Sequence, residues 1–100
     1  MVNALINAVR NGKRVTAVVE LQARFDEEAN IHWAARLKEE GARVVYGVPG
    51  LKVHSKLCLI ERRARRKTVS TLCLGTGNFN EDTALSYADH YLFTCQPQLA

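Results

Sequence analysis

The segment GLKVHSKLCLIE, residues 50–61, alternates like a β-strand but places a histidine and a lysine one residue apart. The alternation predicts two faces, one formed by Val53, Ser55, Leu57 and Leu59 and the other by His54, Lys56, Cys58 and Ile60. A half-buried strand normally keeps one face apolar and the other solvated, whereas both faces are largely apolar here. His54 and Lys56 therefore need an explanation beyond packing.

The residues before this segment predict a helix, a strand, a second helix and a second strand. Apolar residues at helical spacing indicate a helix over residues 2–10 that Asn11 and Gly12 terminate. The β-branched run at 14–21 predicts a buried strand, and residues 42–48 predict another. Asp26 is the expected N-cap of the intervening helix, which extends to about Glu40 and ends at Gly41. Its buried face is predicted to carry Ala29, Trp33 and Leu37.

The residues after the segment predict a hairpin and one further strand. The basic run RRARRK, residues 62–67, is the expected tip, and residues 68–75 are the returning strand. A glycine-rich turn at 75–84 then leads into a final strand at 86–94. The order α-β-α-β-β-β joins a parallel βαβ unit to an antiparallel hairpin, which predicts an α/β fold with a mixed sheet flanked by helices.

Composition restricts the class of protein and its partners. A chain of 100 residues with 47% hydrophobic residues is one small domain or a piece of a larger one, and it is not of disordered composition. The formal charge of +4 favours anionic partners such as phosphates. The sequence has no apolar stretch near the ~18 residues of a membrane span and no signal-peptide pattern. Three cysteines without metal-ligand spacing indicate reduced thiols in a cytoplasmic protein.

A second polar feature, GTGNFN at residues 75–80, is expected near His54. If residues 57–61 pair with 69–74, the glycine turn falls beside the start of the histidine strand, where Asn78 approaches His54. A nucleophilic imidazole, an ammonium group and amide donors on a glycine turn suit phosphoryl transfer. Glycines at 75 and 77 allow the backbone to approach an anion closely.

Two short motifs carry a resemblance to a known superfamily. HSKLCLIE, residues 54–61, resembles the H-x-K-x4-D motif of the phospholipase D superfamily, with Glu61 in place of the aspartate. GTGN, residues 75–78, resembles the G-[ST]-x-N motif that follows it. A longer resemblance covers residues 15–60 together with GTGNFNEDTALSY, residues 75–87, and is to the bacterial polyphosphate kinase family. Residues 1–100 resemble part of the first of two phospholipase-D-like C-terminal domains, and only CQPQLA, residues 95–100, is unlike the family.

The resemblance implies an activity and roles for particular residues. The family reversibly transfers the terminal phosphate of ATP to inorganic polyphosphate, using Mg²⁺ and a phosphohistidine. The phosphorylated histidine corresponds to His54, and Lys56 and Asn78 follow the superfamily motif. Arg24 corresponds to an arginine of the magnesium–phosphate site, where a guanidinium would grip phosphate oxygens rather than the cation. Tyr87, expected on the last strand, corresponds to a nucleotide contact.

The resemblance also implies that the chain is a single partial domain of a longer enzyme. Family members add other domains, one of which supplies a second essential histidine, so the isolated chain is expected to have little activity. Expected partners are ATP or ADP, polyphosphate, the missing domains and a second copy in a homo-oligomer, with no nucleic acid. The expected location is the cytoplasm or the periphery of the inner membrane.

Simpler interpretations stay open beside these. His54, Lys56, Asn78 and Tyr87 could be ordinary packing, surface or turn residues, and Arg24 could pair with Asp26 or Glu27. His32 and His90 match no motif and are interpreted as structural. The basic run is interpreted as a solvated tip, with polyanion contact as the alternative. Two other functions are a catalytically inactive remnant that binds phosphate or polyanions, and half of a phospholipase-D-type nuclease or phosphodiesterase site.

Overall fold

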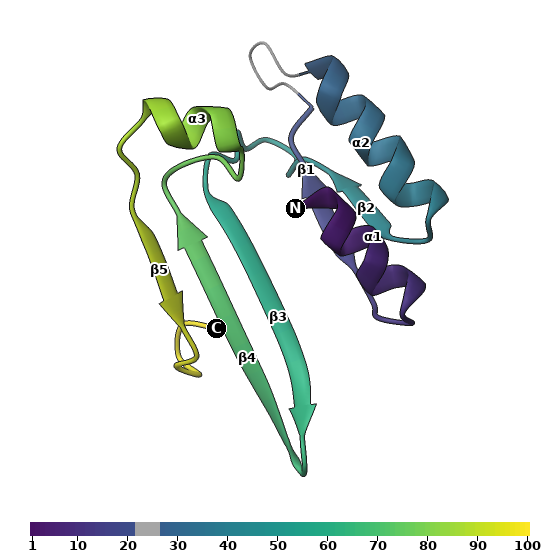
Figure 1. The fold of residues 1–100 in the computed structure, drawn as a ribbon, viewed down its shortest axis with the longest axis vertical. Helices are drawn as coiled ribbons and strands as arrows, with labels where there is room; N and C mark the ends of the chain where they lie inside the picture. Colours follow the sequence, from purple (N-terminus) through teal and green to yellow (C-terminus); the bar gives the residue numbers. More distant parts are fainter. Residues whose placement is uncertain (22–26) are drawn as a thin grey trace. The chain divides into compact units, whose positions relative to one another are not determined.

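The computed structural model describes residues 1–21 and 27–100, which form two compact units, residues 1–53 and 54–100. Each unit is described by itself. In chain order the elements are α1 (Val2–Arg10), β1 (Thr16–Val19), α2 (Glu27–Glu39), β2 (Arg43–Tyr46), β3 (Lys56–Ala64), β4 (Lys67–Gly75), α3 (Glu81–Ser86) and β5 (Tyr91–Thr94) (Figure 1). The α/β class is confirmed, with α3 as an additional short helix.

The first unit is a βαβ arrangement preceded by a helix. Strands β1 and β2 pair in parallel, with Thr16 opposite Arg43, and α2 connects them. The termination of α1 at Asn11 and Gly12 is confirmed: Asn11 Nδ2 donates to the carbonyl of Asn7 at 2.7 Å, and Gly12 has a φ of 72°. This left-handed conformation favours glycine because it has no Cβ.

The core of this unit is small and lies where both helices meet the strands. Ile6 of α1, Leu37 of α2 and Ala42 are buried together. Packed around them are Val2, Leu5, Val9, Val15, Ala17 and Val44. The prediction for α2 was wrong in part, because Ala29 is exposed, Trp33 is 40% exposed, and Ala34 is buried with Leu37. The small side chain of Ala34 allows close packing of α2, and Trp33 is rotated by about 100° from it around the helix.

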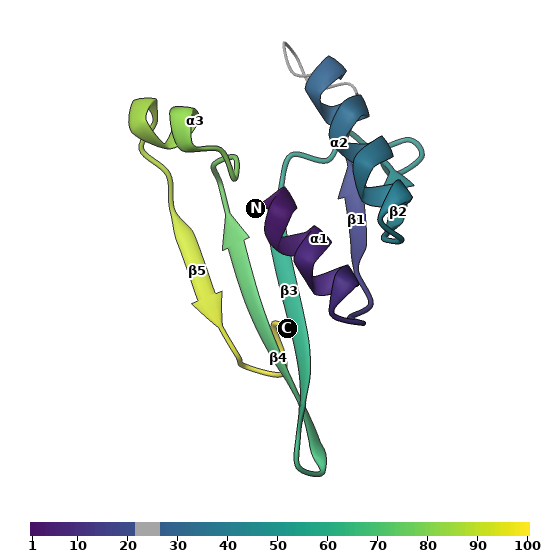
Figure 2. The ribbon, with the colours of Figure 1, turned by 45° about the vertical axis from the view of Figure 1, so that its right-hand side comes forward.

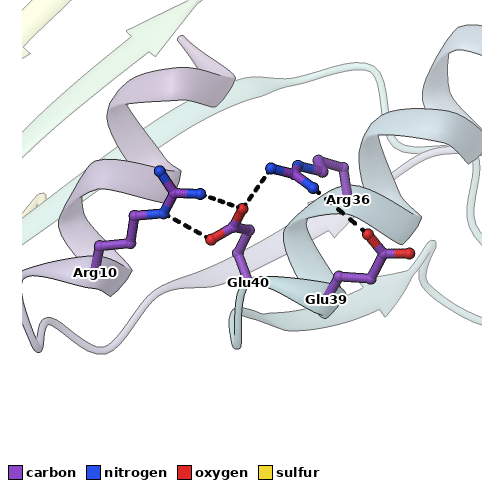
Figure 3. Close-up of polar contacts among 4 residues, drawn as sticks. All are labelled: Arg10, Arg36, Glu39 and Glu40. Carbon is purple, nitrogen blue, oxygen red and sulfur yellow. Dashed lines mark hydrogen bonds and ion pairs between the residues drawn. The ribbon is translucent and has the colours of Figure 1, made fainter.

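A carboxylate joins the C-terminal ends of α1 and α2. Glu40 accepts hydrogen bonds from Arg10 Nε at 2.8 Å and Nη2 at 2.6 Å, and Arg36 Nη2 lies 2.6 Å from the same carboxylate (Figure 3). Arg36 also lies 3.8 Å from Glu39. The hydrogen bonds from Arg10, with smaller contributions from the charges of Arg10 and Arg36, lower the pKa of Glu40. This fork-like pairing is the geometry that a guanidinium and a carboxylate prefer.

The second unit is a three-stranded antiparallel sheet in the order β3-β4-β5. Strands β3 and β4 form a long hairpin in which Lys56 is opposite Gly75 and Ala64 is opposite Lys67. Figure 2 shows the two paired strands crossing near the turn, as the right-handed twist of a two-stranded ribbon produces. Strand β5 then pairs with β4, placing Tyr91 opposite Gly75. The predicted hairpin and its returning strand are confirmed.

Three details of the predicted second half were wrong. The final strand begins at Tyr91, not at residue 86, because residues 81–86 form α3. That helix begins after Asn80, whose Oδ1 accepts from the backbone N–H groups of Asp82 at 2.9 Å and Thr83 at 3.2 Å, as an N-cap does. His54 precedes β3 instead of lying within it. The parallel and antiparallel strands, expected in one mixed sheet, are assigned to two sheets.

Candidate active site

His54 and Lys56 are in direct contact at the start of the hairpin. Lys56 Nζ lies 3.3 Å from Nδ1 and 3.2 Å from Nε2 of His54, and it donates to the His54 carbonyl oxygen at 2.6 Å. A neutral imidazole has one acceptor nitrogen, so the ammonium group has a ring partner in either tautomer. His54 is exposed and Lys56 is half-buried. The pair therefore combines an exposed imidazole with a cation held beside it.

The glycine turn leaves the sheet at the same end of the hairpin. Because Gly75 is directly opposite Lys56, the turn begins level with the first residue of β3. Asn78 is exposed and lies three residues further along. Within the described part of the chain, the Asn78 side chain forms no hydrogen bond with His54 or Lys56. Strand register therefore places the start of the turn, rather than Asn78 itself, beside Lys56.

A side-chain clamp fixes the beginning of this turn to the segment before β5. Thr76 Oγ1 donates to Asp89 Oδ1 at 2.9 Å and accepts from the backbone N–H of His90 at 3.0 Å. The backbone N–H of Thr76 donates to the His90 carbonyl at 3.1 Å. The hydroxyl thus acts as donor and acceptor at once. His90, interpreted as structural, contributes to the clamp through its backbone.

The two glycines of the turn are in close contact with the side chains of Tyr91 and Asp89. A Cβ on Gly75 would lie 2.6 Å from Tyr91 Cδ1, and a Cβ on Gly77 would lie 2.8 Å from Asp89 Cβ. Tyr91 also donates its hydroxyl to the Asn78 carbonyl at 3.2 Å. Neither distance leaves room for a methyl group. The glycines are therefore needed for packing of the turn.

Thr76, Asp89 and Tyr91 were not found from the sequence. Thr76 was visible inside GTGN, but its hydroxyl gains a role only when β5 pairs with β4. Asp89 and Tyr91 lie more than ten residues away and have no motif of their own. Pairing of β4 with β5, which a local pattern does not specify, is the step that creates these contacts.

Of the two remaining candidate residues, Tyr87 lies in the described part of the chain and Arg24 does not. Tyr87 is the C-cap of α3, not a strand residue, and its side chain is 70% exposed. Its backbone N–H donates to the Thr83 carbonyl at 3.0 Å. The ring is thus open to solvent, in the same unit as His54. Arg24 and the expected N-cap Asp26 lie outside the described residues.

The described residues do not form a metal site of their own. Within residues 1–21 and 27–100, no group of three or more His, Cys, Asp or Glu side chains could hold a metal ion. Mg²⁺ prefers oxygen ligands, and one or two carboxylates commonly bind it together with substrate phosphates. The described residues therefore offer no three-ligand cluster for Mg²⁺. Over the same residues, no helix is long and apolar enough to cross a membrane.

Comparison with known proteins gives one consistent result. The family model described as "Polyphosphate kinase C-terminal domain 1" matches residues 1–100. Polyphosphate kinase from Vibrio vulnificus (strain YJ016) is 57% identical over 100 residues, which are 100% of this chain and 14% of that protein. The enzyme of that name from Escherichia coli (strain K12) is 54% identical over 99 residues, covering 99% of this chain and 14% of the relative.

A solved structure agrees with the sequence relatives. The crystal structure of polyphosphate kinase from Porphyromonas gingivalis superposes with a TM-score of 0.69 at 45% identity. The similarity covers 94% of this chain and 16% of that one. The chain therefore spans about one seventh of the length of the relatives it matches.

Proposed function

Because the chain belongs to the polyphosphate kinase family, through C-terminal domain 1, we propose that it takes part in reversible transfer of phosphate from ATP to inorganic polyphosphate. The observation that carries the proposal is the contact between Lys56 Nζ and the ring of His54 at 3.2 Å. It joins a nucleophile and a cation at an exposed end of a sheet. Family membership supports the reaction, and this contact supports His54 as its centre.

The first step forms a phosphohistidine. A lone pair on a ring nitrogen of His54 attacks the terminal phosphorus of ATP, forming an N–P bond while the bond to the bridging oxygen breaks and ADP leaves. In the second step a terminal oxygen of polyphosphate attacks the same phosphorus, and the N–P bond breaks to release the imidazole. Each step is reversible, so the same centre can run in both directions.

The neighbouring groups act on charge and position. Lys56 offsets the negative charge of the transferred phosphoryl oxygens, and the amide of Asn78 donates to them. Gly75 and Gly77 let Tyr91 and Asp89 pack against the turn that carries Asn78. We further propose that the exposed ring of Tyr87 contacts the nucleotide and that Arg24 binds phosphate. Mg²⁺ is proposed to arrive with the nucleotide phosphates, because the described residues offer it no ligand set.

Phosphate transfer to His54 tests this function. The chain is mixed with a V. vulnificus polyphosphate kinase from which the matching region has been removed, and supplied with Mg²⁺ and ATP labelled at the terminal phosphate. Acid-labile, base-stable label on His54, absent in His54→Ala, is the expected result. Label confined to another residue would contradict the assignment.

Two alternatives have their own readouts. An inactive phosphate-binding remnant is favoured by the charge of +4. It predicts ATP or polyphosphate binding without label on His54 in the mixture. A phospholipase-D-type nuclease half-site is favoured by the spacing of His54, Lys56 and GTGN. It predicts cleavage of DNA without phosphate transfer.

A further inference from the structure

The end of the β3–β4 hairpin carries a cluster of unneutralised charge. This basic tip consists of Arg62, Arg63, Arg65, Arg66 and Lys67, all of them exposed. The hairpin contains six of the chain's 14 Lys and Arg residues but only one of its 10 Asp and Glu residues, so it holds the whole positive excess. In the part of the chain that the structure describes, none of the five cations forms an ion pair.

The turn itself is built from residues that a tight hairpin does not favour. Ala64 pairs with Lys67, so Arg65 and Arg66 form a two-residue loop, and Arg65 has a φ of 57°. Two-residue hairpin loops need positive φ at the first central residue, where glycine or asparagine is preferred. Arginine at this position is strained by its Cβ. The backbone therefore disfavours arginine at position 65, and its charge offers a reason for its presence there.

The hairpin connects the tip to the reaction centre. Arg62 follows Lys56 by six positions in β3, and because this offset is even their side chains lie on one face of the sheet. At ~3.3 Å per residue they are about 20 Å apart along the strand. A ligand that reaches both must be an extended anion with many charges. Inorganic polyphosphate, the acceptor in the proposed function, has this chemistry.

We propose that the basic tip is an accessory binding site for long inorganic polyphosphate, whose end is held at His54 and Lys56. The proposal rests on the proposed function for the identity of its ligand. Nucleic acid fits the tip less well. Proteins that bind single strands combine basic grooves with aromatic side chains on which bases stack, and residues 62–68 contain no aromatic residue.

Two double variants test the site in the chain as it exists. Arg65→Gly with Arg66→Asn removes two charges and supplies a preferred hairpin turn, so loss of binding cannot be attributed to a worse turn. Lys13→Gln with Arg14→Gln removes two adjacent exposed charges from the first unit and is the matched control. Binding of long-chain polyphosphate, tripolyphosphate and a single-stranded oligonucleotide is measured for each protein over a series of salt concentrations.

The site predicts a loss that depends on chain length. The tip variant should bind long polyphosphate about fivefold more weakly, with a salt slope smaller by about 1.4, because each lost cation releases about 0.7 fewer counterions. Tripolyphosphate binding by the tip variant should be unchanged, and the affinity of the control variant for long polyphosphate should fall less than twofold. Equal losses in both double variants would overturn the proposal, as would an oligonucleotide that binds as tightly as polyphosphate.

The phosphate-transfer assay separates this site from the proposed function. In the mixture with the truncated relative, the tip variant should still place label on His54 but should show a raised KM for long polyphosphate only. Label on His54 with an unchanged KM for long chains would overturn the accessory site while leaving the function intact. Absence of label on His54 in the unsubstituted chain would overturn the function instead.

Discussion

At the scale of single residues, Lys56 connects His54, the proposed nucleophile, to the sheet. Its ammonium group is tied to the His54 carbonyl at 2.6 Å while it lies against the ring, so the lysine orients the backbone before the strand as well as supplying charge. A fixed cation stabilises developing charge without reorganising during the reaction. A mobile surface lysine would not have this advantage.

Replacing Lys56 by Gln should lower the rate of His54 phosphorylation by about 100-fold, since loss of one positioned donor to a transition-state oxyanion costs about 10²–10³ in rate. The measurement is single-turnover labelling in the mixture with the truncated relative. Lys52→Gln, which removes another exposed lysine close in sequence, should change the rate less than twofold. Similar rates for the two variants would mean that Lys56 is only a surface residue.

Thr76 is the residue on which the clamp of the glycine turn depends. Thr76→Val removes a hydroxyl that serves both Asp89 and His90, so the free energy of unfolding should fall by about 1 kcal/mol. Chemical denaturation is the measurement. Thr71→Val, at an exposed position of β4, the strand that ends just before Thr76, is the control and should have little effect. An unfolding energy equal to that of the control would show that the clamp is not formed in solution.

At the scale of elements, the hairpin turn has an unfavourable residue that can be improved. Arg65→Gly relieves the strain of a φ of 57° and should stabilise the second unit by about 1 kcal/mol. Arg66 has no positive φ, so Arg66→Gly should give no gain and is the matched control for lost charge. Thermal unfolding compares the two. Equal shifts in Tm for the two variants would mean that relief of charge repulsion, and not of backbone strain, causes the stabilisation.

Local patterns predicted the elements of the chain better than their contacts. The helix ending at Asn11–Gly12 and the hairpin that places Gly75 near the histidine followed from spacing and turn chemistry, and the structure confirms both. The helix at Glu81–Ser86 was missed because residues 75–84 were interpreted as one turn, although Asn80 followed by acidic residues is a capping signal. The clamp at Thr76 depends on strand pairing distant in sequence, which no local pattern contains.

The connection between α1 and α2 should make the first unit sensitive to acid. Arg10 lowers the pKa of Glu40 in the folded chain, so this contribution to stability is complete above the unfolded pKa of about 4.3 and is lost as pH falls through the folded value. Glu40→Gln should therefore have a lower Tm at pH 7, and its difference from the unsubstituted chain should shrink below about pH 4. Glu39→Gln, a more exposed partner of Arg36, should show little of this dependence. A Tm difference independent of pH would exclude the ion pair as its cause.

At the scale of the whole molecule, the proposed site residues and the buried apolar cluster lie in different units. His54, Lys56, Asn78 and Tyr87 all belong to the second, and the buried cluster of Ile6, Leu37 and Ala42 belongs to the first. Within the second unit many apolar side chains are exposed, among them Leu57, Leu85, Leu92 and Phe93. Burial of such surface is the main favourable term in association, so further protein surface would stabilise this unit.

The chain on its own should have little or no phosphate-transfer activity. Its described residues contain one histidine–lysine pair, and they supply no second set of groups to stabilise the leaving ADP. Removal of part of a positioned catalytic set can cost several orders of magnitude, because the groups act as a unit. Mixing with the V. vulnificus enzyme lacking the matching region should raise polyphosphate synthesis at least 100-fold over either protein alone, a conservative fraction of the effective molarity that positioning provides. The same mixture prepared with His54→Ala is the control and should stay at background. Full activity of the chain alone would show that one histidine site suffices, and no gain on mixing would favour the inactive, phosphate-binding alternative.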